Sequence, residues 1–178
     1  MYRHIIDKFY PQGLKVRDIL LRHSSAVAEE ALAVADRHSL PLDREEIVGA
    51  AMLHDIGIIR TNAPGIGCYG LAPYLCHGVI GADMLRSCGA DEKYALVCER
   101  HTGAGLTFKE IEARQLPLPA DRSYMPESVL EKLICYADCF YSKSGDMQRK
   151  DLERVRRSME KFGPNVLVRF DELHRQFG

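Results

Sequence analysis

Apolar residues recur at helical spacing through most of this 178-residue chain. The longest such segment is expected to run from about residue 14 to 38, with Val16, Leu20, Val27 and Val34 on one face. Further helices are expected at about 43–57, 73–88, 91–102, 107–114, 129–141 and 150–162, followed by a short helical tail. No stretch shows the alternation that is typical of strands. The sequence therefore predicts an all-α fold of about six to eight helices.

The length of the chain is sufficient for one compact domain with a hydrophobic core. No stretch has the composition of an interdomain linker, and residues 1–13 are expected to be a lead-in that ends at Pro11-Gln12-Gly13. We therefore predict one domain over residues 1–178, with its core at about 14–145 and C-terminal helices at 150–178.

The charge balance is close to neutral, with 24 basic and 25 acidic residues and a formal net charge of −1. Such a balance favours neither a polyanion nor a membrane surface as a partner. No apolar run approaches the roughly 20 residues that cross a membrane, and the N-terminus has no signal-peptide core. We therefore expect a cytoplasmic protein that binds neither nucleic acid nor membrane.

Two residues able to bind metal, His54 and Asp55, stand side by side after an apolar stretch and before Gly57. Adjacent residues on a helix project about 100° apart, so one ion could use both only at a distorted helix end. Gly57 is expected to supply that end, because glycine commonly follows the last residue of a helix.

Four further residues of this kind, His23, His77, His101 and Asp138, fall on the apolar faces of other expected helices. Any one of them alone is more often a structural residue of the core. Burying the whole set is costly unless the groups are paired or bind a cation. Imidazoles and carboxylates together suit iron, manganese, zinc or nickel better than calcium or thiolate-binding metals.

These residues occur in a fixed order along the chain: His23, His54-Asp55-Ile56-Gly57, His77-Gly78, His101-Thr102-Gly103 and Asp138. With this order the chain resembles the HD-domain superfamily of metal-dependent phosphohydrolases, in its HDIG subgroup. The resemblance covers roughly residues 14–145 and implies an all-α HD domain.

The resemblance also implies a dinuclear metal site. It assigns the first ion to His23, His54, Asp55 and Asp138. It assigns the second ion to His77 and His101, with Asp55 as the bridging ligand. Iron is the metal implied first and manganese next, with zinc, nickel or magnesium open.

The function implied by the resemblance is a phosphohydrolase, with Asp55 and His54 as catalytic residues. Two ions can activate a water that attacks a phosphate ester or anhydride of a nucleotide or another small phosphorylated metabolite. Two alternatives remain at this point. One is a mixed-valent di-iron HD-domain oxygenase, and the other is a non-catalytic HD-type sensor or binding module.

Substrate contacts are expected from Arg60 and Lys143, which flank helix ends that carry predicted ligands. Many dinuclear members of the superfamily have a lysine directly after the His-Asp-Ile-Gly motif, where this chain has Ile58. That difference disfavours a cyclic dinucleotide as the substrate. The sequence leaves the oligomeric state open.

Overall fold

The computed structural model describes residues 2–145 and 147–178. Within them it has nine α-helices and one two-stranded ribbon, so the predicted all-α fold is confirmed. The α-helices are α1 (Tyr2–Phe9), α2 (Lys15–Arg37), α3 (Arg44–Leu53), α4 (His77–Ser87), α5 (Glu92–Arg100), α6 (Phe108–Ala113), α7 (Val129–Asp138), α8 (Leu152–Glu160) and α9 (Pro164–Phe177). The ribbon is β1 (Asn62–Ala63) with β2 (Cys68–Tyr69), and short 3-10 turns are η1 (Ile56–Arg60), η2 (Pro64–Ile66) and η3 (Tyr74–Cys76).

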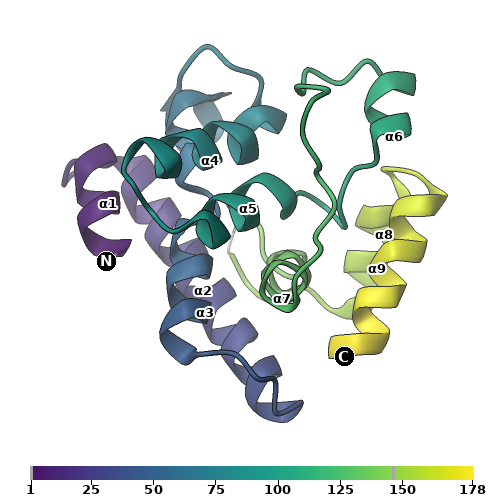
Figure 1. Ribbon diagram of the computed structural model, residues 1–178. Helices are drawn as coiled ribbons and strands as arrows, with labels where there is room; N and C mark the ends of the chain where they lie inside the picture. The colour runs from purple at the N-terminus through teal and green to yellow at the C-terminus, as the bar shows by residue number, and fades with distance from the viewer. Residues whose placement is uncertain (1, 146) are drawn as a thin grey trace.

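Helix α7 lies at the centre of the molecule and is seen end-on in Figure 1. Helices α2, α3, α5 and α9 all pack against it. Helix α4 lies outside α5 and contacts both α5 and η1 (Figure 1). The helices that carry the predicted metal ligands are therefore neighbours, with α7 in the middle.

Side-chain caps explain where several of these helices begin. The Asp43 carboxylate accepts hydrogen bonds from two amides of the first turn of α3. Asp91 does the same for one amide of α5, and Thr107 and Glu110 form a reciprocal capping box on α6. Each cap satisfies amides that have no partner within the helix. The predicted starts at Asp43 and Asp91 are confirmed.

The lead-in of the chain is helical, which the sequence did not predict. Ile5 and Ile6 of α1 enter the core. The Tyr10 hydroxyl donates a hydrogen bond to the Ile56 carbonyl at 2.7 Å and accepts one from the Ile59 amide at 3.2 Å. Through Tyr10, the segment that directly follows α1 is therefore hydrogen-bonded to η1, the turn that comes after His54 and Asp55.

Most helices contribute to one continuous core of buried side chains, which runs from α1 to α9. Aromatic residues fill its C-terminal part, where the Tyr136 ring stacks on Phe170 with centroids 6.1 Å apart. A smaller cluster lies beneath the loop after α6 and includes Leu106, Ile111 and Tyr124. Among the described residues, no helix is both long and apolar enough to cross a membrane.

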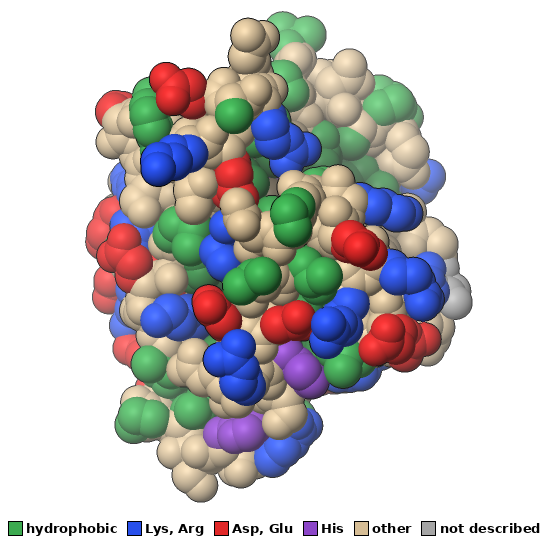
Figure 2. All heavy atoms as spheres, turned by 90° about the vertical axis from the view of Figure 1, so that its right-hand side faces the viewer, with side chains coloured by type: hydrophobic (Ala, Val, Ile, Leu, Met, Phe, Trp, Pro, Cys, Tyr) green, Lys and Arg blue, Asp and Glu red, His purple; other side chains and the backbone are tan. Residues whose placement is uncertain are grey.

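Figure 2 shows the side of the molecule that lies at the right of Figure 1, where α6, α8 and α9 are located. Basic and acidic side chains alternate over this face, with hydrophobic side chains between them. Pairs such as Arg156 with Asp171, 3.1 Å apart, account for part of this mixture. This face therefore has no large area of one charge.

Candidate metal centre

The six predicted ligands come together in one cluster. In the first group, His23, His54, Asp55 and Asp138 each offer a ligand atom within 4.8 Å of the others. Asp55, His77 and His101 form a second group by the same measure. Five of the six residues are buried, and the Asp138 side chain is 16 % exposed. Side chains from five segments of the chain thus meet at one point.

In the first group the ligand atoms surround a common space. His23 Nε2 lies 2.9 Å from Asp138 Oδ1 and 3.1 Å from Asp55 Oδ2. His54 Nε2 also lies 3.1 Å from Asp55 Oδ2, and 3.2 Å from His23 Nε2. Two imidazole nitrogens and two carboxylate oxygens suit a first-row transition metal ion.

The second group uses the other oxygen of the same aspartate. Asp55 Oδ1 lies 3.4 Å from the Nε2 atoms of His77 and His101. Those two nitrogens are 3.0 Å apart. One oxygen of Asp55 thus faces each group, which is the arrangement that a bridging carboxylate requires.

Three of the four histidines are oriented in the same way. The Nδ1 atom of each donates a hydrogen bond to the carbonyl three residues earlier, at 2.6 to 2.7 Å: His54 to Ala51, His77 to Tyr74 and His101 to Cys98. A neutral imidazole that carries its proton on Nδ1 has its lone pair on Nε2, which here points into the cluster. The local helical turns therefore prepare these histidines to bind metal through Nε2.

His54 and Asp55 reach one site because α3 stops between Leu53 and Asp55. His54 keeps helical dihedral angles, whereas Asp55 has φ −107° and ψ 12° and leaves the helix. A helix end does bring both side chains to one site, as predicted, but α3 ends at Leu53 and not at Gly57, so the predicted position and cause of the end were wrong. Gly57 lies inside η1, and a Cβ atom there would lie 2.1 Å from the His77 carbonyl oxygen and 2.5 Å from the Gly81 amide nitrogen.

Glycines allow the close packing that brings the two groups together. Gly57 lets η1 lie against α4, which places His77 beside Asp55. At Gly78 a Cβ atom would lie 2.5 Å from the Cys98 carbonyl oxygen, so this glycine lets α4 lie against α5. The distance between His77 and His101 depends on this second contact.

The buried charges of the cluster fit a cation. Asp55 Oδ1 and Asp138 Oδ1 accept no hydrogen bond of good geometry from the described residues, and His23 Nδ1 also has no partner among them. Burial alone would raise the pKa of Asp55, but its electrostatic interactions with His54 and Lys143 outweigh burial and hold it well below its ordinary value. Burial lowers the pKa of His77 to about 3, so this imidazole is neutral and able to bind a metal ion. Two carboxylates and four imidazoles in a buried space form a suitable donor set for metal ions.

Two further residues border the cluster. Lys143 Nζ lies 2.7 Å from Asp55 Oδ2, and its side chain is 14 % exposed. The Tyr74 ring stacks on His77 with centroids 4.8 Å apart. Tyr74 falls within the helix expected at 73–88 and was not among the predicted site residues, although its position three residues before His77 could have indicated that its carbonyl meets the imidazole. Asp138 and Lys143 mark the side from which solvent reaches the cluster.

The structure does not bring Arg60 to this cluster. Arg60 is exposed, and its guanidinium lies 6.0 Å from the centre of the Phe9 ring. It borders a separate surface pocket that is lined in part by Leu14 and Tyr69. Of the two predicted substrate contacts, only Lys143 lies beside the predicted ligands.

Comparisons with known proteins relate this chain to a family and to three proteins. The family model described as HD domain matches residues 20–142, a span that contains all six predicted ligands. A tRNA (cytidine(56)-2'-O)-methyltransferase of Picrophilus torridus is 34 % identical over 163 residues, which are 89 % of this chain and 41 % of that protein. The protein of the same name from Thermoplasma volcanium is 32 % identical over 170 residues, which are 96 % of this chain and 44 % of that protein.

An uncharacterized protein of Methanocaldococcus jannaschii is 41 % identical over 122 residues, which are 67 % of this chain and 64 % of that protein. No solved structure matches the chain. The chain spans less than half the length of the two named methyltransferases.

The names of these relatives contradict three predictions. They describe a transferase that acts on tRNA, so the predicted phosphohydrolase activity and the predicted small phosphorylated substrate are wrong. The expectation that nucleic acid is not a partner is wrong for the same reason. The physical cause of these errors is that six ligands determine which ions a site can hold, whereas the reaction depends on the molecule that reaches them. A net charge averages over the whole surface and does not exclude local contacts with RNA.

Proposed function

Because the chain belongs to the HD domain family, we propose that it is a metal-binding HD domain that binds tRNA and serves the 2'-O-methylation of a cytidine. One observation carries this proposal: 96 % of the chain aligns with a relative that is named for that reaction. The chain spans less than half of that relative. We therefore assign to it one part of the reaction, the binding of the RNA beside the methylated ribose.

The metal centre is the part of the chain that we assign to this task. His23, His54, Asp55 and Asp138 would hold one ion, and His77 and His101 together with Asp55 would hold a second. Iron is the first candidate and manganese the second, as the resemblance to the HD-domain superfamily implies, while the imidazole and carboxylate ligands also suit zinc or nickel. When bound, such ions supply Lewis acidity toward oxygen ligands, which in RNA are phosphate and ribose oxygens.

Lys143 adds a positive charge at the exposed edge of the centre. Its ammonium group lies beside Asp55, and its side chain is partly exposed. An ammonium group binds a phosphate oxygen as a compact point charge. We assign to Lys143 a contact with a tRNA phosphate, in place of the small substrate that the sequence predicted.

The continuous core supports the prediction of one domain over residues 1–178. We also propose that this domain acts in the cytoplasm.

A footprint of the protein on a tRNA transcript tests the proposal. The protein, loaded with iron or manganese, is expected to protect nucleotides around cytidine 56 from hydroxyl radicals. It is also expected to bind the transcript more tightly than an RNA hairpin of equal length. Removal of the metal with a chelator should weaken both effects. The absence of a footprint, or a footprint that leaves cytidine 56 unprotected, would overturn the proposal.

A further inference from the structure

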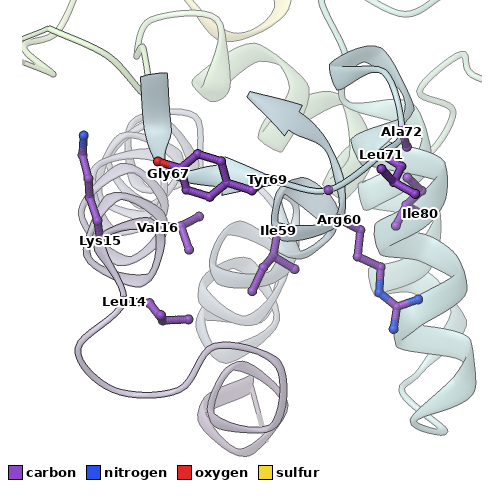
Figure 3. Close-up of a pocket in the computed structure, with 11 residues that line it drawn as sticks. Leu14, Lys15, Val16, Ile59, Arg60, Gly67, Tyr69, Leu71, Ala72 and Ile80 are labelled. Carbon is purple, nitrogen blue, oxygen red and sulfur yellow. The ribbon is translucent and has the colours of Figure 1, made fainter. Parts of the chain in front are cut away.

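A surface pocket of about 870 Å³ lies between the start of α2, η1, the end of β2 and α4. None of the six predicted metal ligands lines it. Figure 3 shows Val16 and Ile59 in its floor, Tyr69 above them, and Leu71 at one side. We call this pocket, with Lys15, Val16, Ile59, Arg60, Tyr69 and Leu71, the α2–η1 groove.

Two side chains of the groove, Tyr69 and Leu71, are unusually open to solvent for their apolar character. Tyr69 is 79 % exposed and Leu71 is 99 % exposed. The backbone that carries them is nevertheless fixed, because Asn62 pairs with Tyr69 and the Gly70 amide donates a hydrogen bond to the Thr61 carbonyl at 2.9 Å. An exposed ring on a fixed backbone is a stacking platform that needs little ordering when a ligand binds.

Two cations stand at opposite ends of the groove. In Figure 3, Lys15 is at one end and Arg60 at the other, with the Tyr69 ring between them. Neither cation forms an ion pair with a carboxylate in the part of the chain that the structure describes. No acidic residue lines the pocket.

Some other arginines of the protein are balanced by carboxylates, whereas others, such as Arg22 and Arg157, form no ion pair among the described residues. Arg17 pairs with Asp7 at 2.6 Å, and Arg122 pairs with Asp83 and Glu99 at 2.8 Å. The face seen in Figure 2 likewise mixes both charges. The groove thus combines an exposed aromatic ring with positive charges that the described residues leave unbalanced.

This combination suits one class of ligand. Unpaired bases of RNA stack on aromatic side chains, while the phosphates on either side of the base bind lysine and arginine. An acidic peptide could pair with both cations, but it would make less use of the flat aromatic ring that lies between them. The apolar floor of Val16 and Ile59 can pack against the second face or the edge of a base.

We propose that the α2–η1 groove binds an unpaired nucleotide of RNA, with its base on Tyr69 and its flanking phosphates at Lys15 and Arg60. The proposal rests on the proposed function, in which RNA is the partner, and adds a second RNA contact apart from the metal centre. In this arrangement Arg60 contacts a phosphate, as the sequence predicted, but the phosphate belongs to RNA and lies in a different pocket.

The test measures binding of a fluorescent single-stranded RNA octamer and of a labelled tRNA transcript to the full chain. Tyr69→Ala should weaken octamer binding on the order of tenfold, because it removes one stacked base. Tyr69→Phe should restore binding to within about twofold, since the phenyl ring still stacks. Lys15→Ala combined with Arg60→Ala should weaken binding and reduce the slope of log affinity against log salt by about 1.4.

Matched controls come from α6, which lies away from the groove. Phe108 is an exposed aromatic residue, and Lys109 is an exposed cation beside it. Phe108→Ala and Lys109→Ala should leave binding unchanged. Circular dichroism should show the wild-type helix content for every variant, because the substituted side chains are exposed.

The outcomes separate this inference from the proposed function. If the wild type binds RNA and the groove variants bind equally well, the groove inference is overturned while the footprint still tests the function. If the octamer binds through Tyr69 but cytidine 56 is not protected, the groove inference stands and the proposed function fails. If the wild type binds neither RNA, both fail. If the groove variants change the oligomeric state and leave RNA affinity unchanged, the occupant is a second copy of the chain and the inference is overturned.

Discussion

Asp55 is the residue on which the metal centre depends most. Its two oxygens face two separate groups of ligands, and among the described residues no other side chain belongs to both groups. The neighbouring His54 contributes to only one group. The bridging role was implied by the resemblance to the HD-domain superfamily, and the expected helix end predicted only that adjacent His54 and Asp55 could both face one site.

Asp55→Asn tests that role with little change in shape. The amide has no negative charge and cannot bridge two cations in the same way, so the metal content should fall from about two ions to below one per chain. Elemental analysis of the purified variant provides the measurement. Asp36→Asn is the control, since Asp36 is exposed and pairs only with Arg44. Retention of both ions by the Asp55 variant would show that the bridge is misassigned.

A buried glutamate away from the centre makes stability depend on pH. Burial would raise the pKa of Glu131, but the Glu127 amide at 2.9 Å and Arg100 at 3.0 Å outweigh burial and lower it below the ordinary value of 4.5. A lowered carboxyl pKa stabilises the fold above the unfolded value, and this stability is lost as the pH falls through the folded value. The free energy of unfolding should therefore decrease below about pH 4.5.

Glu131→Gln separates this group from the others that titrate in acid. The variant leaves Arg100 with the exposed Glu127, 3.1 Å away, as its remaining carboxylate partner, so it should lose about 2 kcal/mol at pH 7. Its further loss between pH 5 and pH 3 should be smaller than that of the wild type. Urea unfolding followed by circular dichroism at several pH values gives both quantities. Parallel curves for the two proteins would mean that Glu131 does not contribute to the acid sensitivity.

At the scale of elements, the arrangement depends on how closely η1, α4 and α5 approach one another. The helices themselves could be predicted, because their apolar spacing and the caps at Asp43 and Asp91 are local signals. The close approach of η1 to α4 could not be predicted, since it depends on a backbone contact between Gly57 and His77. Helix α1 was also missed, because its adjacent Ile5 and Ile6 do not repeat at helical spacing over several turns.

Gly57→Ala should therefore disturb the centre without removing a ligand. The added methyl group would overlap the His77 carbonyl oxygen, so η1 or α4 must move. We expect a loss of more than about 2 kcal/mol in unfolding free energy and a weaker second metal group. Gly65→Ala is the control, because no atom lies within 4 Å of the added position. Equal melting temperatures and metal contents for the two variants would contradict this account of the packing.

At the scale of the whole molecule, five segments spread from α2 to α7 bring six ligands to one buried point. Their convergence was predicted because each falls on the apolar face of its helix. The reaction was not predicted correctly. The ligands indicate metal binding, but they do not identify tRNA, which the name of the relatives gives as the substrate. The α2–η1 groove could not be predicted from the sequence either, since Lys15, Arg60 and Tyr69 are far apart along the chain and line one pocket only in the folded structure.

The most direct test of this account is the metal content of the protein purified without added metal, beside that of a His77→Ala and His101→Ala double variant. The account predicts about two iron or manganese ions per wild-type chain and about one in the variant, since the first group of ligands remains intact. A wild-type protein that holds no metal after reconstitution would contradict the central claim, and a variant that keeps both ions would contradict the division into two groups.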